Sequence, residues 1–141
     1  MLPPIETIIE NFGILDEGPD QIEYLIELGR ALPPFPEDLL TEHNRVHGCE
    51  SQVWVASRMD EAQEPPRLSL RGTSDSTVTK GLIALVMALH DGKTAQEIGA
   101  VDVFGVFKEI GLGAHLTSKR SNGVRAMAER IHHDAARLLA A

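Results

Sequence analysis

Residues Gln52–Ser57 read QVWVAS, and residues Arg67–Arg71 read RLSLR. The first run is rich in β-branched and aromatic residues, and the second alternates strictly between polar and apolar residues, as a half-buried strand does. Residues 58–66 between them hold three acidic residues and two prolines, which suits a hairpin loop and is too short for a crossover helix. We therefore predict two antiparallel strands here, with a short third strand at Arg45–His47.

Helical periodicity lies on both sides of this hairpin. The most apolar pattern begins after Ser74 or Asp75, the two candidate N-caps, and covers most of the circumference of a helix, so it predicts the core helix. Further helices are predicted at residues 5–11, 21–32, 95–100, 103–110 and 118–139. The predicted fold class is therefore α+β, a small antiparallel sheet of about three strands packed against several helices.

Composition restricts the kind of protein that the chain can be. It has 141 residues and a net charge of −8, and no repeat or interdomain linker interrupts it, so we predict one acidic domain over residues 1–141. The negative charge disfavours nucleic acid as a partner. The longest apolar run, Leu82–Leu89, is far shorter than the roughly 18 residues that span a membrane. The N-terminal residues lack the features of a secretory signal, which predicts a cytoplasmic protein.

The chain has a single cysteine, Cys49, in the sequence HGCES at residues 47–51. One thiol per chain excludes an internal disulfide, a multi-cysteine zinc site and a Cys-only iron–sulfur site. The six histidines show no ligand spacing, and no phosphate-binding glycine loop is present, so we expect no metal and no cofactor. Cys49 is then either a small buried hydrophobic residue or, because Gly48 favours a tight turn, a reactive thiol at a loop tip.

Some polar residues are candidates to support such a thiol. His47 lies two residues before Cys49 and is a candidate base, although a solvated histidine is the more usual explanation of such a residue. Lys119 and Arg120 fall in the first turn of the last predicted helix, where cations oppose the helix dipole. They either form salt bridges with acidic residues or face an anionic sulfur. Gly123 lies inside the same helix and predicts the close approach of another backbone.

Three separate segments resemble one known family. The segment GCESQVW at residues 48–54 resembles the GCxSQVW signature of the SufE/CsdE family, sulfur acceptors in iron–sulfur cluster assembly. GTSD at residues 72–75 with KGL at residues 80–82 resembles a second segment of that family. GLGAHLT at residues 111–117, followed by Arg120 and Gly123, resembles a third. The resemblance runs in order through nearly the whole chain, and Ser76, where the family usually has Ala, is a small departure.

The resemblance implies a SufE-like fold and a specific role. Cys49 would accept sulfur as a persulfide from a cysteine desulfurase of the SufS or CsdA type, stimulate that enzyme, and pass the sulfur to an iron–sulfur scaffold. Pyridoxal phosphate would belong to the desulfurase, and this chain would be its partner and activator. Gly48 would be the hinge of a mobile loop, and Arg120, Glu50, Gln52 and His47 would support the thiol or contact the partner.

Alternatives remain at this stage. A stand-alone cysteine nucleophile of the Cys–His hydrolase type would need a base, for which the sequence offers only His47 and distant His115. A cluster scaffold is disfavoured by the single cysteine. The sequence does not separate the SufE branch from the CsdE branch, and it leaves open whether the protein is a monomer or a homodimer.

Overall fold

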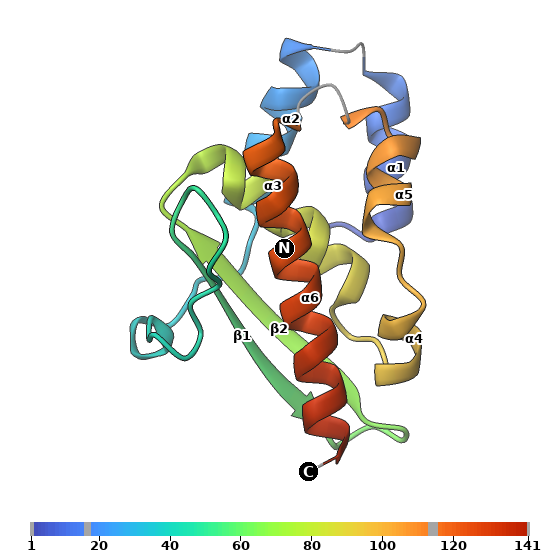
Figure 1. Ribbon diagram of the computed structural model, residues 1–141. Helices are drawn as coiled ribbons and strands as arrows, with labels where there is room; N and C mark the ends of the chain where they lie inside the picture. Colours follow the sequence, from blue (N-terminus) through green and yellow to red (C-terminus); the bar gives the residue numbers. More distant parts are fainter. Residues whose placement is uncertain (1, 16–17, 113–115, 141) are drawn as a thin grey trace.

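The computed structural model describes residues 2–15, 18–112 and 116–140. It has an α+β fold, which confirms the predicted class (Figure 1). The elements in chain order are α1 (Ile5–Ile14), α2 (Pro19–Arg30), the short 3₁₀ helix η1 (Glu37–Leu39), β1 (Val53–Asp60), β2 (Arg67–Ser74), α3 (Thr77–His90), α4 (Ala95–Gly99), α5 (Val103–Glu109) and α6 (Ser118–Ala140). Among the described residues, no helix is both long and apolar enough to cross a membrane.

The strands β1 and β2 form the predicted antiparallel hairpin, in a register that runs from Val53 opposite Ser74 to Asp60 opposite Arg67. The prediction of about three strands is wrong, because the sheet formed by the described residues has two. The expected third strand contributes one bridge, Arg45 opposite Trp54. Pairing stops there because the chain turns at Gly48, whose φ of 92° lies in the left-handed region that favours glycine.

The core helix α3 begins later than its predicted caps. Ser74 is the last residue of β2, and Asp75 binds the backbone of the loop before β1. Ser76 is the N-cap, and its Oγ accepts a hydrogen bond from the Thr79 N–H at 3.3 Å. Strand β2 therefore extends beyond Arg71, where its alternating sequence pattern ended, and the N-cap of α3 lies one to two residues later than predicted.

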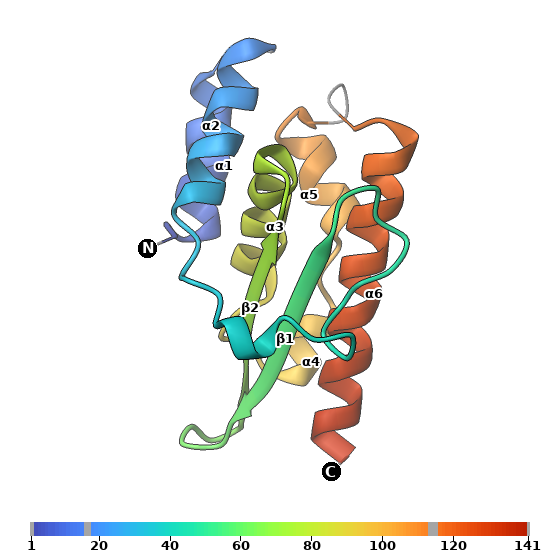
Figure 2. The same ribbon diagram turned by 90° about the vertical axis from the view of Figure 1, so that its left-hand side faces the viewer.

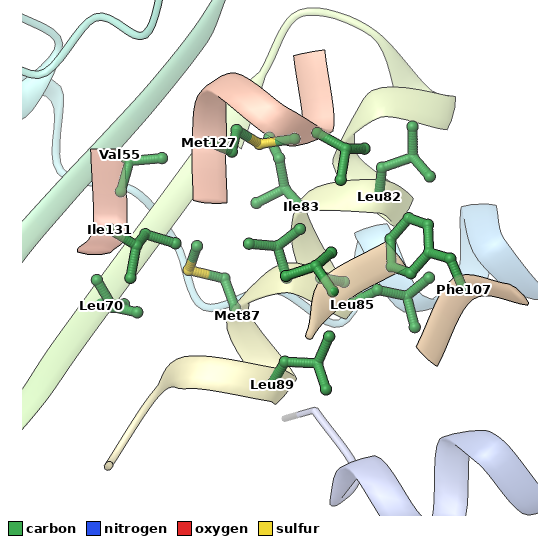
Figure 3. Packing of buried hydrophobic residues seen from close by; sticks show 14 of the residues in the cluster. Val55, Leu70, Leu82, Ile83, Leu85, Met87, Leu89, Phe107, Met127 and Ile131 are labelled. Carbon is green, nitrogen blue, oxygen red and sulfur yellow. The ribbon is translucent and has the colours of Figure 1, made fainter. Parts of the chain in front are cut away.

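Helices cover one face of the sheet. Figure 2 shows α3 behind β2 and α6 alongside β1, with α1 and α2 on the side of α3 away from α6. Side chains from both strands and several helices meet in one buried cluster, in which Val55 and Leu70 lie beside Met87 of α3 and Ile131 of α6, and Leu85 lies on the other side of α3, near Phe107 (Figure 3). The alternation of buried and half-buried residues along the strands follows from this single covered face. This packing holds the N-terminal halves of α3 and α6 beside each other.

Two glycines allow α2 and α3 to cross closely. A Cβ at Gly81 would lie 2.3 Å from the carbonyl oxygen of Leu25, and a Cβ at Gly29 would lie 2.8 Å from the backbone nitrogen of Gly81. No side chain fits at such distances, so Gly81 is required by packing. Gly81 also belongs to the KGL segment that carries part of the family resemblance.

We predict that Gly81→Ala destabilises the protein because the added methyl group must push α2 and α3 apart. The expected loss in the free energy of unfolding is about 2 kcal/mol or more, which lowers Tm by roughly 6 °C. Gly13→Ala is the matched control, since it is also helical and nothing among the described residues lies within 4 Å of its Cβ position. Thermal unfolding measures both, and equal Tm values for Gly81→Ala and the wild-type protein would contradict this packing account.

Candidate functional site

Cys49 lies in a loop, residues 47–52, that rests on the N-terminal half of α6. The thiol is half-buried, and its Sγ donates a weak hydrogen bond to the carbonyl oxygen of Gly123 at 3.7 Å. A Cβ at Gly123 would lie 3.4 Å from Sγ and 3.8 Å from Cα of Cys49. Gly123 is therefore the place where the loop approaches α6 closely, as the sequence predicted. A methyl group there would meet the loop at van der Waals distance, and a side chain longer than that would compete with the sulfur for space.

The loop reaches this position through a turn at Gly48. Its φ of 92° is strained for other residue types, and its Cβ position lies 3.5 Å from the Cβ of Ala126 on α6. The turn places Cys49 against α6 and leaves Gly48 itself exposed. Glycine is needed here by conformation, which is consistent with the hinge expected for this residue.

Polar contacts tie the other end of the loop to the start of α3. The hydroxyl of Thr79 donates a hydrogen bond to Ser51 Oγ at 3.2 Å. The backbone N–H of Gln52 donates to Asp75 Oδ1 at 3.0 Å, and the Asp75 N–H donates back to the Gln52 carbonyl at 3.4 Å. Neither Asp75 nor Thr79 was predicted as a site residue. Their signal in the sequence was only their place within or beside the GTSD and KGL segments.

A cavity of about 160 Å³ opens beside the thiol. Its walls are Cys49, Glu50 and Ser51 from the loop, Ser76, Thr79 and Leu82 from the start of α3, and Lys119, Arg120, Gly123, Val124 and Met127 from α6. This volume holds a few atoms beyond the sulfur, since a water takes about 30 Å³ in the liquid. Apolar and hydroxyl-bearing side chains share the walls with two cationic residues and with the carboxylate of Glu50, so the walls carry one more positive than negative charge and suit a small polarisable group with negative charge.

The predicted cations lie at this cavity. Lys119 Nζ is 3.7 Å from Glu50 Oε1, and both side chains are largely exposed, so this ion pair links the loop to α6 and contributes little stability. The salt-bridge explanation therefore applies to Lys119. Arg120 is half-buried and lines the cavity, and its backbone N–H donates to Thr117 Oγ1 at 3.2 Å at the start of α6.

Burial raises the pKa of the Cys49 thiol, because desolvation disfavours the thiolate, and the positive charge of Arg45 partly opposes this rise. In this arrangement the sulfur is protonated at neutral pH and can donate to Gly123. The arrangement thus stores a thiol in a shielded position, and its nucleophilic form is favoured only when the sulfur becomes more solvated or more strongly paired with a cation.

Two expected supporting residues contribute less than the sequence indicated. His47 lies outside the residues that line the cavity; its Nε2 pairs with Glu42 Oε1, and 69% of its side chain is exposed. Gln52 is exposed and contributes its backbone to the contact with Asp75. His115, the second histidine considered for a hydrolase, lies outside the described residues. The structure thus brings together Cys49, Glu50 and Arg120, and holds His47 apart from them.

The part of the chain that the structure describes contains no candidate metal site. Over residues 2–15, 18–112 and 116–140, no group of three or more His, Cys, Asp or Glu side chains could hold a metal ion.

Comparison with known proteins matches this arrangement to a family. The profile described as "SufE: Fe-S metabolism associated domain" matches residues 6–135. SufE-like proteins of Rhizobium etli and Rhizobium meliloti are each 44% identical over 131 residues, which is 93% of this chain and 88% and 94% of theirs. The solution structure of a hypothetical protein from Thermus thermophilus shares the fold, with a TM-score of 0.76, 22% identity and full coverage of both chains. The chain therefore belongs to the SufE family, which supports a role in Fe–S metabolism.

Proposed function

We propose that this protein is a sulfur acceptor that takes persulfide sulfur onto Cys49 from a cysteine desulfurase and passes it on for iron–sulfur cluster assembly. The observation that carries the proposal is the position of the chain's one thiol at a small cavity with apolar and cationic walls. Membership of the SufE family and the matched segment around Cys49 support it. A single thiol suffices for this role, because the persulfide intermediate forms on one cysteine sulfur.

The reaction that we propose is an exchange at sulfur. The Cys49 thiolate attacks the terminal sulfur of a persulfide on the donor, a new S–S bond forms to Cys49, and the donor's S–S bond breaks. The electron pair of the broken bond stays on the donor cysteine, which takes up the proton that Cys49 released. Cys49 then carries a persulfide, and the donor is ready for another cycle, so acceptance of sulfur stimulates the desulfurase.

The cavity supports storage of the product. A terminal sulfur on Cys49 has room in a volume of about 160 Å³, beside the side chains of Leu82 and Met127. A persulfide is more acidic than a thiol, and the Arg120 side chain at the same cavity would stabilise its negative charge. Partial burial would also limit reaction with thiols in solution.

We propose that the loop leaves this position for transfer, because partial burial of the sulfur restricts the approach of a donor on a second protein. The loop is held by the weak Cys49–Gly123 contact, the exposed Glu50–Lys119 pair and the hydrogen bonds to Thr79 and Asp75. Each contact is individually weak, so docking of a partner can offset their loss. We propose that Gly48 provides the rotation, and that Glu50 and Gln52 are then presented to the partner.

We propose a pyridoxal-phosphate cysteine desulfurase of the SufS or CsdA type as the donor and an iron–sulfur scaffold as the recipient. The exchange would take place in the cytoplasm, where a free thiol persists in reduced form. The Cys–His hydrolase alternative finds less support, because His47 pairs with Glu42 away from the cavity. A hydrolase would need that ring within hydrogen-bonding reach of the thiol.

Replacing the acceptor sulfur tests this proposal. We expect Cys49→Ser to abolish stimulation of a cysteine desulfurase, because a hydroxyl does not accept sulfur, while Tm stays near the wild-type value since the side chains have similar size. Cysteine-dependent release of alanine measures the stimulation. Full stimulation by Cys49→Ser would show that the protein activates the desulfurase without accepting sulfur.

Arg120→Ala tests the cationic wall of the cavity. We expect a reduction of roughly tenfold in desulfurase stimulation, the size of effect that loss of one charge-assisted interaction produces, with Tm within a few degrees of wild type. Arg58→Ala is the matched control, because Arg58 is an exposed arginine on β1 outside the cavity. A large loss of Tm in Arg120→Ala, with stimulation per folded molecule unchanged, would assign Arg120 a structural role instead.

The raised pKa of Cys49 predicts slow alkylation of the free protein. Below this pKa the sulfur is protonated, so iodoacetamide should react at neutral pH at least about threefold more slowly than with a short peptide of residues 47–51. The rate should rise as the pH increases and the thiolate forms. Reaction of the native protein as fast as the peptide at neutral pH would contradict a shielded thiol.

A further inference from the structure

A cluster of three hydroxyl groups lines the cavity beside Cys49. Ser51 comes from the loop, and Ser76 and Thr79 come from the start of α3. All three residues are half-buried. A hydroxyl group has one proton to donate and two lone pairs that accept. The partner of each hydroxyl proton therefore decides which of these groups is available to a molecule in the cavity.

The hydrogen bonds within this cluster leave the Ser51 proton available. Thr79 Oγ1 donates its proton to Ser51 Oγ at 3.2 Å. Ser51 Oγ is the acceptor in this contact, and its own proton has no acceptor among the described residues. That proton is directed away from Thr79, so it is free to point into the cavity whose wall Ser51 forms. Ser51 is thus a donor that is held in place and lacks an acceptor within the described part of the protein.

Ser76 already has a structural role. Its Oγ accepts a hydrogen bond from the Thr79 N–H at 3.3 Å and caps α3. Its oxygen is therefore tied to the helix, whereas Ser51 lies in the same loop as Cys49 and two residues after it. Of the two serines, Ser51 is the one that stays with the sulfur when the loop moves.

The thiol of Cys49 makes no hydrogen bond to Ser51. Its Sγ donates instead to the Gly123 carbonyl oxygen at 3.7 Å. A persulfide extends the side chain by one S–S bond of about 2 Å. In the cavity of about 160 Å³, a terminal sulfur can therefore bind to wall groups that Sγ does not, and the Ser51 hydroxyl is one of them.

Charged groups at the same cavity act alongside this donor. Glu50 pairs with Lys119 at 3.7 Å, and the start of α3 adds no charged side chain to the walls. Arg120 supplies positive charge to the cavity, which is the role that the proposed function gives it, and Arg45 acts on the unmodified thiol. A substitution of Ser51 leaves all these charges in place. The contribution of a hydroxyl donor can therefore be measured separately from theirs.

We propose that the Ser51 hydroxyl donates a hydrogen bond to the terminal sulfur of a persulfide on Cys49, and that Thr79 is the positioning residue that orients this hydroxyl. The role in sulfur transfer rests on the proposed function. The hydrogen bond can be tested without a desulfurase, because inorganic polysulfide also loads a thiol. The Cys49 thiolate attacks a sulfur of the polysulfide, a new S–S bond forms, and a shorter polysulfide leaves with the electron pair of the broken bond.

The test is the pH dependence of the near-UV absorbance of the perthiolate in the polysulfide-loaded protein. A hydrogen bond to the anion lowers the pKa of the persulfide, so for Ser51→Ala we expect the midpoint to rise by about one pH unit. The midpoint of the unloaded thiol, measured by alkylation, should stay nearly unchanged, because Ser51 makes no hydrogen bond to Sγ. Ser69→Ala is the matched control, since Ser69 is a half-buried serine on β2 outside the cavity walls.

Three results would overturn the assignment of Ser51. The first is a persulfide midpoint for Ser51→Ala that equals that of Ser69→Ala. The second is a rise of the same size in the thiol and persulfide midpoints, which would mean that the substitution changes the exposure of the whole loop. The third is wild-type protein on which mass spectrometry finds no added sulfur after treatment with polysulfide, because the cavity would then hold no terminal sulfur.

Thr79→Val tests the positioning role, because valine has the shape of threonine and lacks its hydroxyl. We expect its persulfide midpoint to rise less than that of Ser51→Ala, since the Ser51 proton remains but loses its fixed direction. Thr79→Ser should restore the wild-type midpoint, and the double variant of Ser51→Ala with Thr79→Val should show no further rise than Ser51→Ala alone. No rise in Thr79→Val, or additive rises in the double variant, would overturn the role of Thr79.

Sulfur loading from a desulfurase separates this inference from the proposed function. If polysulfide loads the protein and the midpoints shift as expected, but a cysteine desulfurase transfers no sulfur to wild type, the proposed function fails and the assignment of Ser51 stands. If the desulfurase loads wild type and the persulfide midpoints of wild type and Ser51→Ala agree, the assignment of Ser51 fails alone.

Discussion

The close approach of the Cys49 loop to α6 at Gly123 is the contact on which the site depends. The sulfur donates a hydrogen bond to the Gly123 carbonyl oxygen at 3.7 Å, and a Cβ at Gly123 would stand 3.4 Å from the sulfur, so the loop rests in direct contact with this part of α6. The position of α6 follows in turn from its packing on β1 and α3. The turn at Gly48, and the hydrogen bond that Arg130 Nη2 donates to the His43 carbonyl oxygen at 2.7 Å, then fix the path of the chain into the loop. The protein core and the position of the Cys49 thiol are thereby linked.

Two opposing effects set the state of the sulfur. Burial favours the protonated thiol, and nearby positive charge favours the thiolate. In the position described here burial is the larger effect, so the thiol is protected. Movement of the loop would remove the desolvation and leave a more reactive sulfur, whereas return to the cavity would shield the product. This pairing of storage with release is what the proposed sulfur carrier would require.

Local sequence patterns predicted much of the fold, and long-range contacts explain the rest. The hairpin and the α-helices of the described residues follow from periodicity and turn residues, with boundaries shifted by a few residues. The prediction of a third strand was wrong, because pairing with β1 ends after Arg45, where the chain approaches its turn at Gly48. The predicted N-cap of α3 was wrong because β2 extends to Ser74. The end of β2 depends on its pairing with β1, which the local sequence does not show.

The site was predictable where residues carry their own signal. Cys49 stands out as the single thiol, and Gly123 as a glycine inside a helix. The contacts of Asp75 and Arg130 could not be predicted, because their partners Gln52 and Arg45 are 23 and 85 residues away in the sequence and no local pattern encodes such a contact. His47 was a candidate base on spacing alone, and the turn directs it elsewhere.

Mass spectrometry of the Cys49 peptide tests the central claim most directly. The purified protein is incubated with an active cysteine desulfurase and free cysteine, and half of the sample is then treated with a reductant. The account predicts added mass for one or more sulfur atoms on Cys49, which the reductant removes. An unmodified Cys49, with the desulfurase turning over and keeping its own persulfide, would contradict it.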